Sequence, residues 1–146
     1  MTKIHFSPGS DCLNAIVDAL KNAKKRANIC VFTISDNRIT DAIREAQLSG
    51  VNVKIISDND KRYDEGSDIE TISRMGIDVK LDKTKAHMHH KFAVIDDTIT
   101  ISGSYNWTRS AETVNHENIM ITDDQDVAKT FTREFDRLWQ QMSPID

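Results

Sequence analysis

The first 80 residues alternate between helical and strand periodicity, and this alternation limits the possible folds more than any other feature. Helical stretches have apolar residues on one face, and the strand-like runs are short and rich in β-branched residues. The expected order is a helix capped by Ser10, strand Asn28–Ile34, helix Asn37–Ser49, strand Val51–Ser57, helix Ser67–Met75 and strand Ile77–Leu81. Short connections between such elements favour α/β units on a largely parallel sheet.

The second half of the chain predicts a hairpin, one more strand and a long amphipathic helix. Two β-rich runs meet at Asp96-Asp97, which suits a tight turn. These elements are expected at Lys91–Ile95, Thr98–Ser102 and Ile119–Thr122, and from Asp123 to about Met142. A length of 146 residues fits one domain. We therefore expect a single α/β domain over residues 1–146, with a mixed, largely parallel β-sheet sandwiched between helices.

The segment from Ala86 to Asn118 carries the residues suited to catalysis. It contains the pattern H-x-K-x4-D-x6-G-S-x-N, formed by His89, Lys91, Asp96, Gly103, Ser104 and Asn106. Residues two apart on a strand face the same way, so an imidazole and a fixed cation share one face and suit a phosphodiester. The serine and asparagine follow an expected tight turn at the glycine, where they can donate hydrogen bonds to non-bridging oxygens.

These residue types support a displacement at phosphorus. The lysine and the two donors, Ser104 and Asn106, would stabilise the charge of a pentavalent transition state. His89 would attack phosphorus and form a phosphohistidine, provided that a carboxylate holds its ring in the correct tautomer. Asp96 lies five residues beyond Lys91 and would face the other side of a strand, so we expect a structural function for it.

The spaced pattern resembles the signature of the phospholipase D superfamily, and most of the chain is similar to its small branch with one motif copy. The resemblance implies the phospholipase D-like fold, a supporting function for Asp96 and Gly103, and Glu117 as the carboxylate that orients His89. Superfamily members with two copies use one histidine as nucleophile and one as acid. A chain with one copy therefore implies a symmetric homodimer with a shared active site at its interface.

The charge distribution bears on the substrate. Nineteen basic against 23 acidic residues give a net charge of −4, which is unusual for a protein that coats nucleic acid. From Lys80 to Lys91, however, four lysines face one aspartate, a local charge of +3 beside His89. The leading hypothesis is a metal-independent endonuclease that hydrolyses DNA or RNA.

Other functions remain open at this point. A phospholipase D or cardiolipin hydrolase would use the same chemistry on a lipid head group, with Met88, Phe92 and Trp107 as the candidates for an apolar rim. A non-catalytic nucleic-acid-binding module on the same fold is a third hypothesis, which the intact motif disfavours. Four histidines form an alternative set of metal ligands: His87, His89, His90 and His116. We expect neither a metal nor another cofactor, because a lysine lies inside the cluster and no cysteine is near.

The sequence contains no run resembling a signal peptide or a membrane span. We therefore expect a cytoplasmic protein without integral membrane association.

Overall fold

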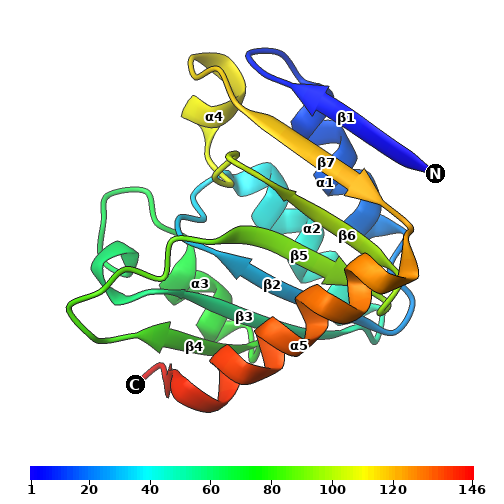
Figure 1. The fold of residues 1–146 in the computed structure, drawn as a ribbon. Coiled ribbons are helices and arrows are strands. Elements are labelled where there is room, and N and C mark those ends of the chain that lie inside the picture. The colour runs from blue at the N-terminus through cyan, green and yellow to red at the C-terminus, as the bar shows by residue number, and fades with distance from the viewer.

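Eight strands form one sheet with helices on both faces in the computed structural model, which describes residues 1–146 (Figure 1). The strands are β1 (Thr2–Phe6), β2 (Arg26–Val31), β3 (Asn52–Asp58), β4 (Asp78–Asp82), β5 (Lys91–Ile95), β6 (Ile99–Gly103), β7 (Asn118–Thr122) and β8 (Ser143–Pro144). The helices are α1 (Asp11–Lys21), α2 (Asn37–Leu48), α3 (Ile69–Arg74), α4 (Arg109–Thr113) and α5 (Gln125–Gln141), with a 3₁₀ turn, η1, at Asn59–Lys61.

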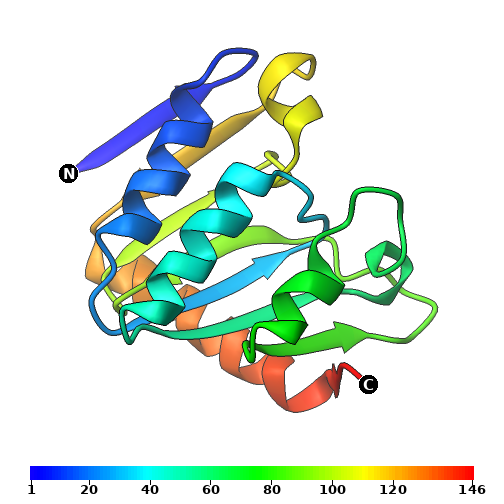
Figure 2. The ribbon, with the colours of Figure 1, turned by 180° about the vertical axis from the view of Figure 1, so that it is seen from behind.

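Helices α1, α2 and α3 cover one face of the sheet, and α5 crosses the other (Figures 1 and 2). The larger core lies under α1–α3, and a smaller core containing Phe92 and Phe135 lies under α5. Aspartate side chains begin two of these helices: Asp36 accepts from the Arg38 N–H at 3.0 Å, and Asp124 accepts from the first turn of α5. The cap of α5 is therefore Asp124, one residue beyond the predicted Asp123. None of the helices is long and apolar enough to cross a bilayer.

The strand order is β1-β7-β6-β5-β2-β3-β4-β8. The predicted mixed sheet between helices is confirmed, but only the pairs β2–β3 and β3–β4 are parallel. All other neighbours are antiparallel, so the sheet is less parallel than expected. The difference arises because β5 and β6 form a hairpin, β7 returns antiparallel to β6 after the segment that contains α4, and β5 joins the parallel part by pairing antiparallel with β2.

One helix and two strands were not predicted, and the predicted position of another strand lay a few residues too far toward the C-terminus. Strand β1 lies at the sheet edge and is mostly exposed, so it lacks the apolar pattern of a buried strand. Helix α4 and strand β8 are too short to leave a periodic signal. Strand β2 begins at Arg26 and ends at Val31, and beyond it Ile34 forms an isolated bridge with Trp107.

One edge of the sheet collects the ends of strands from both halves of the chain. Here β2 ends opposite the start of β5, since Val31 pairs with Lys91. At the same edge β6 ends beside the start of β7, and β1 ends at Phe6 opposite Asn118. We call this the site edge, because the predicted catalytic residues other than Asp96 lie along it.

Asp96 lies at the opposite end of β5 from the site edge, in the hairpin turn. Both turn residues have positive φ, 55° at Asp96 and 60° at Asp97, as a tight turn of this type requires. The Asp96 carboxylate accepts from the backbone N–H groups of Lys24, Lys25 and Arg26 at 2.6–3.2 Å. Burial raises its pKa, but these hydrogen bonds outweigh burial and hold the pKa below its usual value. The carboxylate thereby ties the hairpin to the chain that enters β2.

Asp96→Asn is expected to lower the free energy of unfolding by about 1–3 kcal/mol at pH 7, because the amide lacks the charge that three N–H groups stabilise. The folded pKa lies below the unfolded one, so this stabilisation is complete above the unfolded pKa and disappears as the pH falls through the folded pKa. Urea denaturation of both proteins at pH 7 and at successively lower pH measures the difference.

Asp97→Asn is the matched control, since Asp97 shares the positive φ but only faces Arg26 at 3.5 Å. We expect it to change stability by less than about 0.5 kcal/mol. Equal losses for the two variants, or a loss for Asp96→Asn that persists in acid, would contradict the assigned anchor.

Candidate active site

His89 and Lys91 lie in direct contact at the site edge. The Lys91 Nζ is 2.7 Å from the His89 Nδ1 and 2.9 Å from the His89 carbonyl oxygen. An ammonium group only donates, so the Nδ1 accepts and the proton of the neutral ring lies on Nε2. Loss of surrounding water lowers the pKa of His89, and the Lys91 and His87 charges lower it further. Desolvation also lowers the pKa of Lys91, whereas the negative charge of Glu117 acts in the opposite direction and raises it.

Phe32 is a central residue of this site that the sequence analysis did not single out. Its ring centroid lies 4.5 Å from that of His89, and the Lys91 Nζ lies 5.7 Å from the Phe32 centroid. Lys61, from η1, approaches the same ring at 5.2 Å. The Phe32 N–H donates to the His90 carbonyl at 2.9 Å, which extends the β2–β5 pairing. The predicted strand Asn28–Ile34 included Phe32, and its pattern alone gave no reason to place this residue in the site.

A buried carboxylate, Asp58, holds the loop that carries the histidines. It is 1% exposed and accepts from the Met88 N–H at 2.7 Å and from the Asp60 N–H at 2.9 Å. The His87 Nδ1 lies 3.7 Å from an Asp58 oxygen and 3.4 Å from an Asp60 oxygen. These three residues could ligate a cation together, a different set from the four histidines considered above. The two Asp58 hydrogen bonds already give the carboxylate a structural function.

Ser104 follows β6 and faces β7. Its Oγ accepts from the Asn118 N–H at 3.1 Å, and its hydroxyl proton is left to donate elsewhere. Gly103 does not form the predicted turn. It is the last residue of β6, and a Cβ there would lie 2.1 Å from the Asn118 carbonyl oxygen. The glycine is needed because β7 approaches closely, which brings Ser104 to the site edge.

Asn106 is held by its amide oxygen. The Oδ1 accepts from the Thr33 N–H at 3.3 Å, so the Nδ2 group is free to donate to a substrate. The next residue, Trp107, exchanges backbone hydrogen bonds with the segment after β2: its N–H donates to Thr33, and its carbonyl accepts from Ser35 and Asp36 at 2.9–3.1 Å. The motif loop is therefore fixed against the segment that leads into α2.

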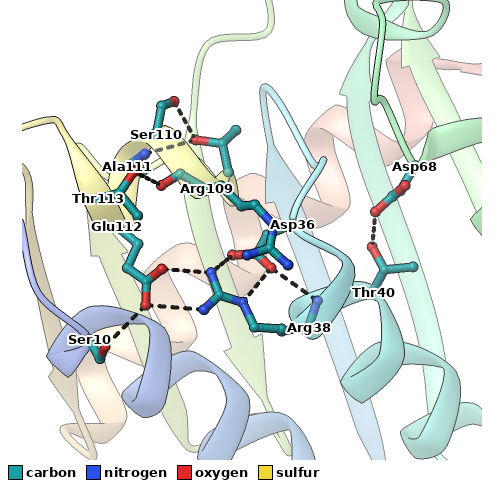
Figure 3. A network of polar contacts seen from close by, with 11 residues as sticks. Ser10, Asp36, Arg38, Thr40, Asp68, Arg109, Ser110, Ala111, Glu112 and Thr113 are labelled. Atoms are coloured by element: carbon teal, nitrogen blue, oxygen red, sulfur yellow. Dashed lines mark hydrogen bonds and ion pairs between the residues drawn. The ribbon is translucent and has the colours of Figure 1, made fainter.

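An ion-pair network connects helix α4, which follows this loop, to the neighbouring helices (Figure 3). Arg38 lies between Asp36 and Glu112, with bonds of 2.7–3.0 Å to the first and 2.7–3.2 Å to the second. Ser10 donates to Glu112 at 3.1 Å. The Arg38 hydrogen bonds hold the pKa of Glu112 below its usual value. The network joins α4 to the starts of α1 and α2.

Glu117 immediately precedes β7, at the same end of the sheet as Lys91. Its Oε2 accepts from the Asn115 side chain at 3.2 Å, and its charge raises the pKa of Lys91. No hydrogen bond joins Glu117 to His89 within the chain. The expected orienting contact is therefore not made inside one chain.

The predicted cationic run from Lys80 to Lys91 is only partly available to a substrate. Lys80 donates to the Trp139 carbonyl at 2.9 Å and lies 4.6 Å from its ring centroid. Lys83 faces Asp146 at 3.6 Å. Lys61 is the cation that the sequence analysis missed, although it also pairs with Asp64 at 3.1 Å.

Solved structures show the same fold. Nuc from Salmonella typhimurium, a phospholipase D family member, superimposes with a TM-score of 0.92 at 25% identity, covering 99% of this chain and 97% of Nuc. NucT from Helicobacter pylori gives a TM-score of 0.91 at 24% identity, covering 99% of both chains.

Similar sequences include mitochondrial cardiolipin hydrolases. The protein of that name from Chlamydomonas reinhardtii is 46% identical over 92% of this chain and 60% of its own length. The human one is 35% identical over 93% of this chain and 54% of its own length. This chain thus spans just over half the length of these relatives.

The fold and the His-Lys site define a protein of the phospholipase D class. Residues 16–139 match the family described as cardiolipin synthase, PLD-like domain. The chain belongs to this PLD-like family, as the spaced motif indicated.

The contact between Lys91 and His89 gives a titration test. We expect the His89 ring to titrate below the ordinary value of about 6.5, and Lys91→Ala to raise that midpoint because it removes a neighbouring positive charge. NMR of the imidazole carbon-bound protons measures both midpoints. Lys85→Ala, an exposed lysine four residues before His89, should leave the midpoint unchanged. A midpoint above 6.5 in the wild type would contradict the described geometry.

Proposed function

We propose that this chain is a metal-independent phosphodiesterase, an endonuclease that hydrolyses DNA or RNA through a phosphohistidine on His89. Its family, the His89–Lys91 contact and the donors Ser104 and Asn106 at the site edge support phosphodiester chemistry. The proposed reaction draws its electrostatic stabilisation from lysine and neutral donors, so it requires no metal.

The observation that favours a nucleic acid over a lipid is the polarity of the surface at His89. A lipid hydrolase needs exposed apolar groups that reach into the membrane. The three candidates for such a rim, Met88, Phe92 and Trp107, are all buried, at 4%, 1% and 2% exposed. Apart from the half-buried Phe32 ring, the groups beside the histidine are lysines, histidines and hydrogen-bond donors, which suit a charged, hydrated strand.

One chain supplies one histidine, whereas the reaction needs a nucleophile and an acid. We propose that two copies meet about a two-fold axis at the site edge, so that each contributes its His89 to one phosphate. His89 Nε2 attacks phosphorus while the bond to the leaving oxygen breaks and the partner's His89 protonates that oxygen. Water, deprotonated by the same second histidine, then attacks phosphorus and breaks the N–P bond.

Substrate binding must change the tautomer of His89. In the free chain its Nδ1 accepts from Lys91, which leaves the proton on the attacking Nε2. A bound phosphate attracts the Lys91 ammonium and releases Nδ1, which then carries the proton and needs a carboxylate. Since Glu117 makes no hydrogen bond to His89 in its own chain, we propose that the carboxylate comes from the partner's Glu117.

A phospholipase or cardiolipin hydrolase is the second candidate, and one structural feature favours it. Ile4, Phe6 and Met120 are exposed side chains on the face of β1 and β7 that α5 leaves open, and Phe6 pairs with Asn118 beside Ser104. The relatives' name also points to a lipid.

The relatives' name includes the word mitochondrial, so the expected cytoplasmic location stays a prediction. A binding module without catalysis is disfavoured by the intact His89–Lys91 contact.

The substrate test compares wild type with His89→Ala in EDTA on three substrates: single-stranded DNA, single-stranded RNA and vesicles containing cardiolipin. We expect oligonucleotide cleavage by the wild type, and a loss of at least about a thousandfold in the variant, because the nucleophile is absent. Cleavage that requires added metal would contradict the mechanism. Release of phosphatidic acid from vesicles without any oligonucleotide cleavage would overturn the nuclease, and Phe6→Ser should then reduce that release.

The shared site is tested by mixing chains. When equal amounts of wild type and His89→Ala are unfolded and refolded together, only about a quarter of the dimers contain His89 in both chains. We therefore expect activity near a quarter of that of the all-wild-type sample, whereas independent sites would leave about half. A monomer in sedimentation velocity at micromolar concentration would also refute the shared site.

A further inference from the structure

A cavity of about 530 Å³ opens beside His89, between α5 and the loop from Asp82 to His90. Its volume falls in the range of small-ligand sites, about 300–1,000 Å³. The loop contributes His87, His89 and His90, and the last turns of α5 contribute Glu134, Arg137 and Gln141. We call this cavity the α5 pocket. Because His89 itself lines it, a group in the pocket can belong to the same nucleotide as the reacting phosphate.

The lining has an apolar floor and a polar wall. Met88 and Leu138, which lie in the smaller core, form the floor together with the half-buried Met142. The imidazoles of His87 and His90 remain about half exposed, at 54% and 51%. Exposed rings of this kind stack on nucleobases.

The charges of the wall exclude a second phosphate. Arg137 forms a two-point contact with Glu134, at 2.9 and 2.6 Å, and His90 Nε2 lies 4.0 Å from the same carboxylate. Asp82, which is buried and accepts from Thr84, adds a further negative charge. No unpaired arginine or lysine lines the pocket, so a second phosphate gains nothing there.

The polar wall can instead hydrogen-bond a neutral group. Gln141 is exposed and its side chain makes no hydrogen bond within the chain, so its carboxamide offers both a free donor and a free acceptor. Such a carboxamide pairs with the edge of a base, as glutamine does with adenine. A planar, neutral ring with polar edges therefore fits the pocket better than a phosphate or an acyl chain.

We propose that the α5 pocket binds the nucleobase next to the scissile phosphate and gives the enzyme a base preference at that one position. This inference rests on the proposed nuclease function. It assigns Gln141 to substrate recognition, with no part in the chemical step.

Two adjacent glutamines provide a matched pair of variants. Gln140 and Gln141 are both exposed near the end of α5, but only Gln141 lines the pocket. Gln141→Leu removes the donor and acceptor at similar volume, and Gln140→Leu makes the same change outside the pocket. Circular dichroism and thermal unfolding establish that both variants are folded.

The readout is the distribution of cut positions on single-stranded oligonucleotides of random sequence, in EDTA. We expect the wild type to show a preference of about tenfold or more at one position flanking the cut, in keeping with one good base contact. Gln141→Leu should reduce it to about twofold, and Gln140→Leu should retain it. An abasic nucleotide at that position should slow wild-type cleavage by about tenfold.

Two results would overturn the base pocket while leaving the nuclease intact. One is normal cleavage with no base preference and no effect of an abasic nucleotide on either side of the cut. The other is an identical change of profile in Gln140→Leu and Gln141→Leu. Turnover of cardiolipin vesicles with no cleavage of any oligonucleotide would overturn the nuclease and the pocket together.

Discussion

The antiparallel pairing of β2 with β5 is the constraint on which the site depends. It joins the parallel strands β2–β4 to the antiparallel strands β5–β7, and its register sets Val31 opposite Lys91. One residue further, the Phe32 N–H bonds the His90 carbonyl, so the Phe32 ring lies against His89. A shift of the register by one residue would turn Lys91 to the other face of the sheet and remove this contact.

Structural contacts also explain how an acidic chain can present a cationic site. Asp58 bonds backbone N–H groups, Asp96 does the same at the far end of β5, and Asp36 and Glu112 are paired with Arg38. These carboxylates are occupied inside the fold and do not face a substrate at the site edge. The net charge of −4 is therefore a poor guide to the surface that a phosphodiester would meet.

The sequence predicted the helices α1, α2 and α5, the hairpin at Asp96-Asp97 and the position of His89 beside Lys91, because each has a strong local signal. Its pattern could not predict strand order, which depends on contacts between distant segments, and so the antiparallel share of the sheet was underestimated. The sequence analysis assigned Gly103 to a tight turn. The structure shows instead that a glycine is needed there because Asn118 approaches closely, a tertiary contact that the sequence pattern does not reveal. Phe32 and Lys61 were missed because the contacts of Phe32 with His89 and of Lys61 with Phe32 join segments that are far apart in the sequence.

Asp58 has a consequence for how the histidine loop responds to a substrate. Its carboxylate fixes the Met88 N–H between His87 and His89, and also the first turn after β3. The loop is thus ordered when the protein folds, and substrate encounter does not have to remove that conformational freedom again. In the proposed reaction, the reorganisation that remains on binding is that of the Lys91 ammonium and the imidazole proton, movements of a few atoms.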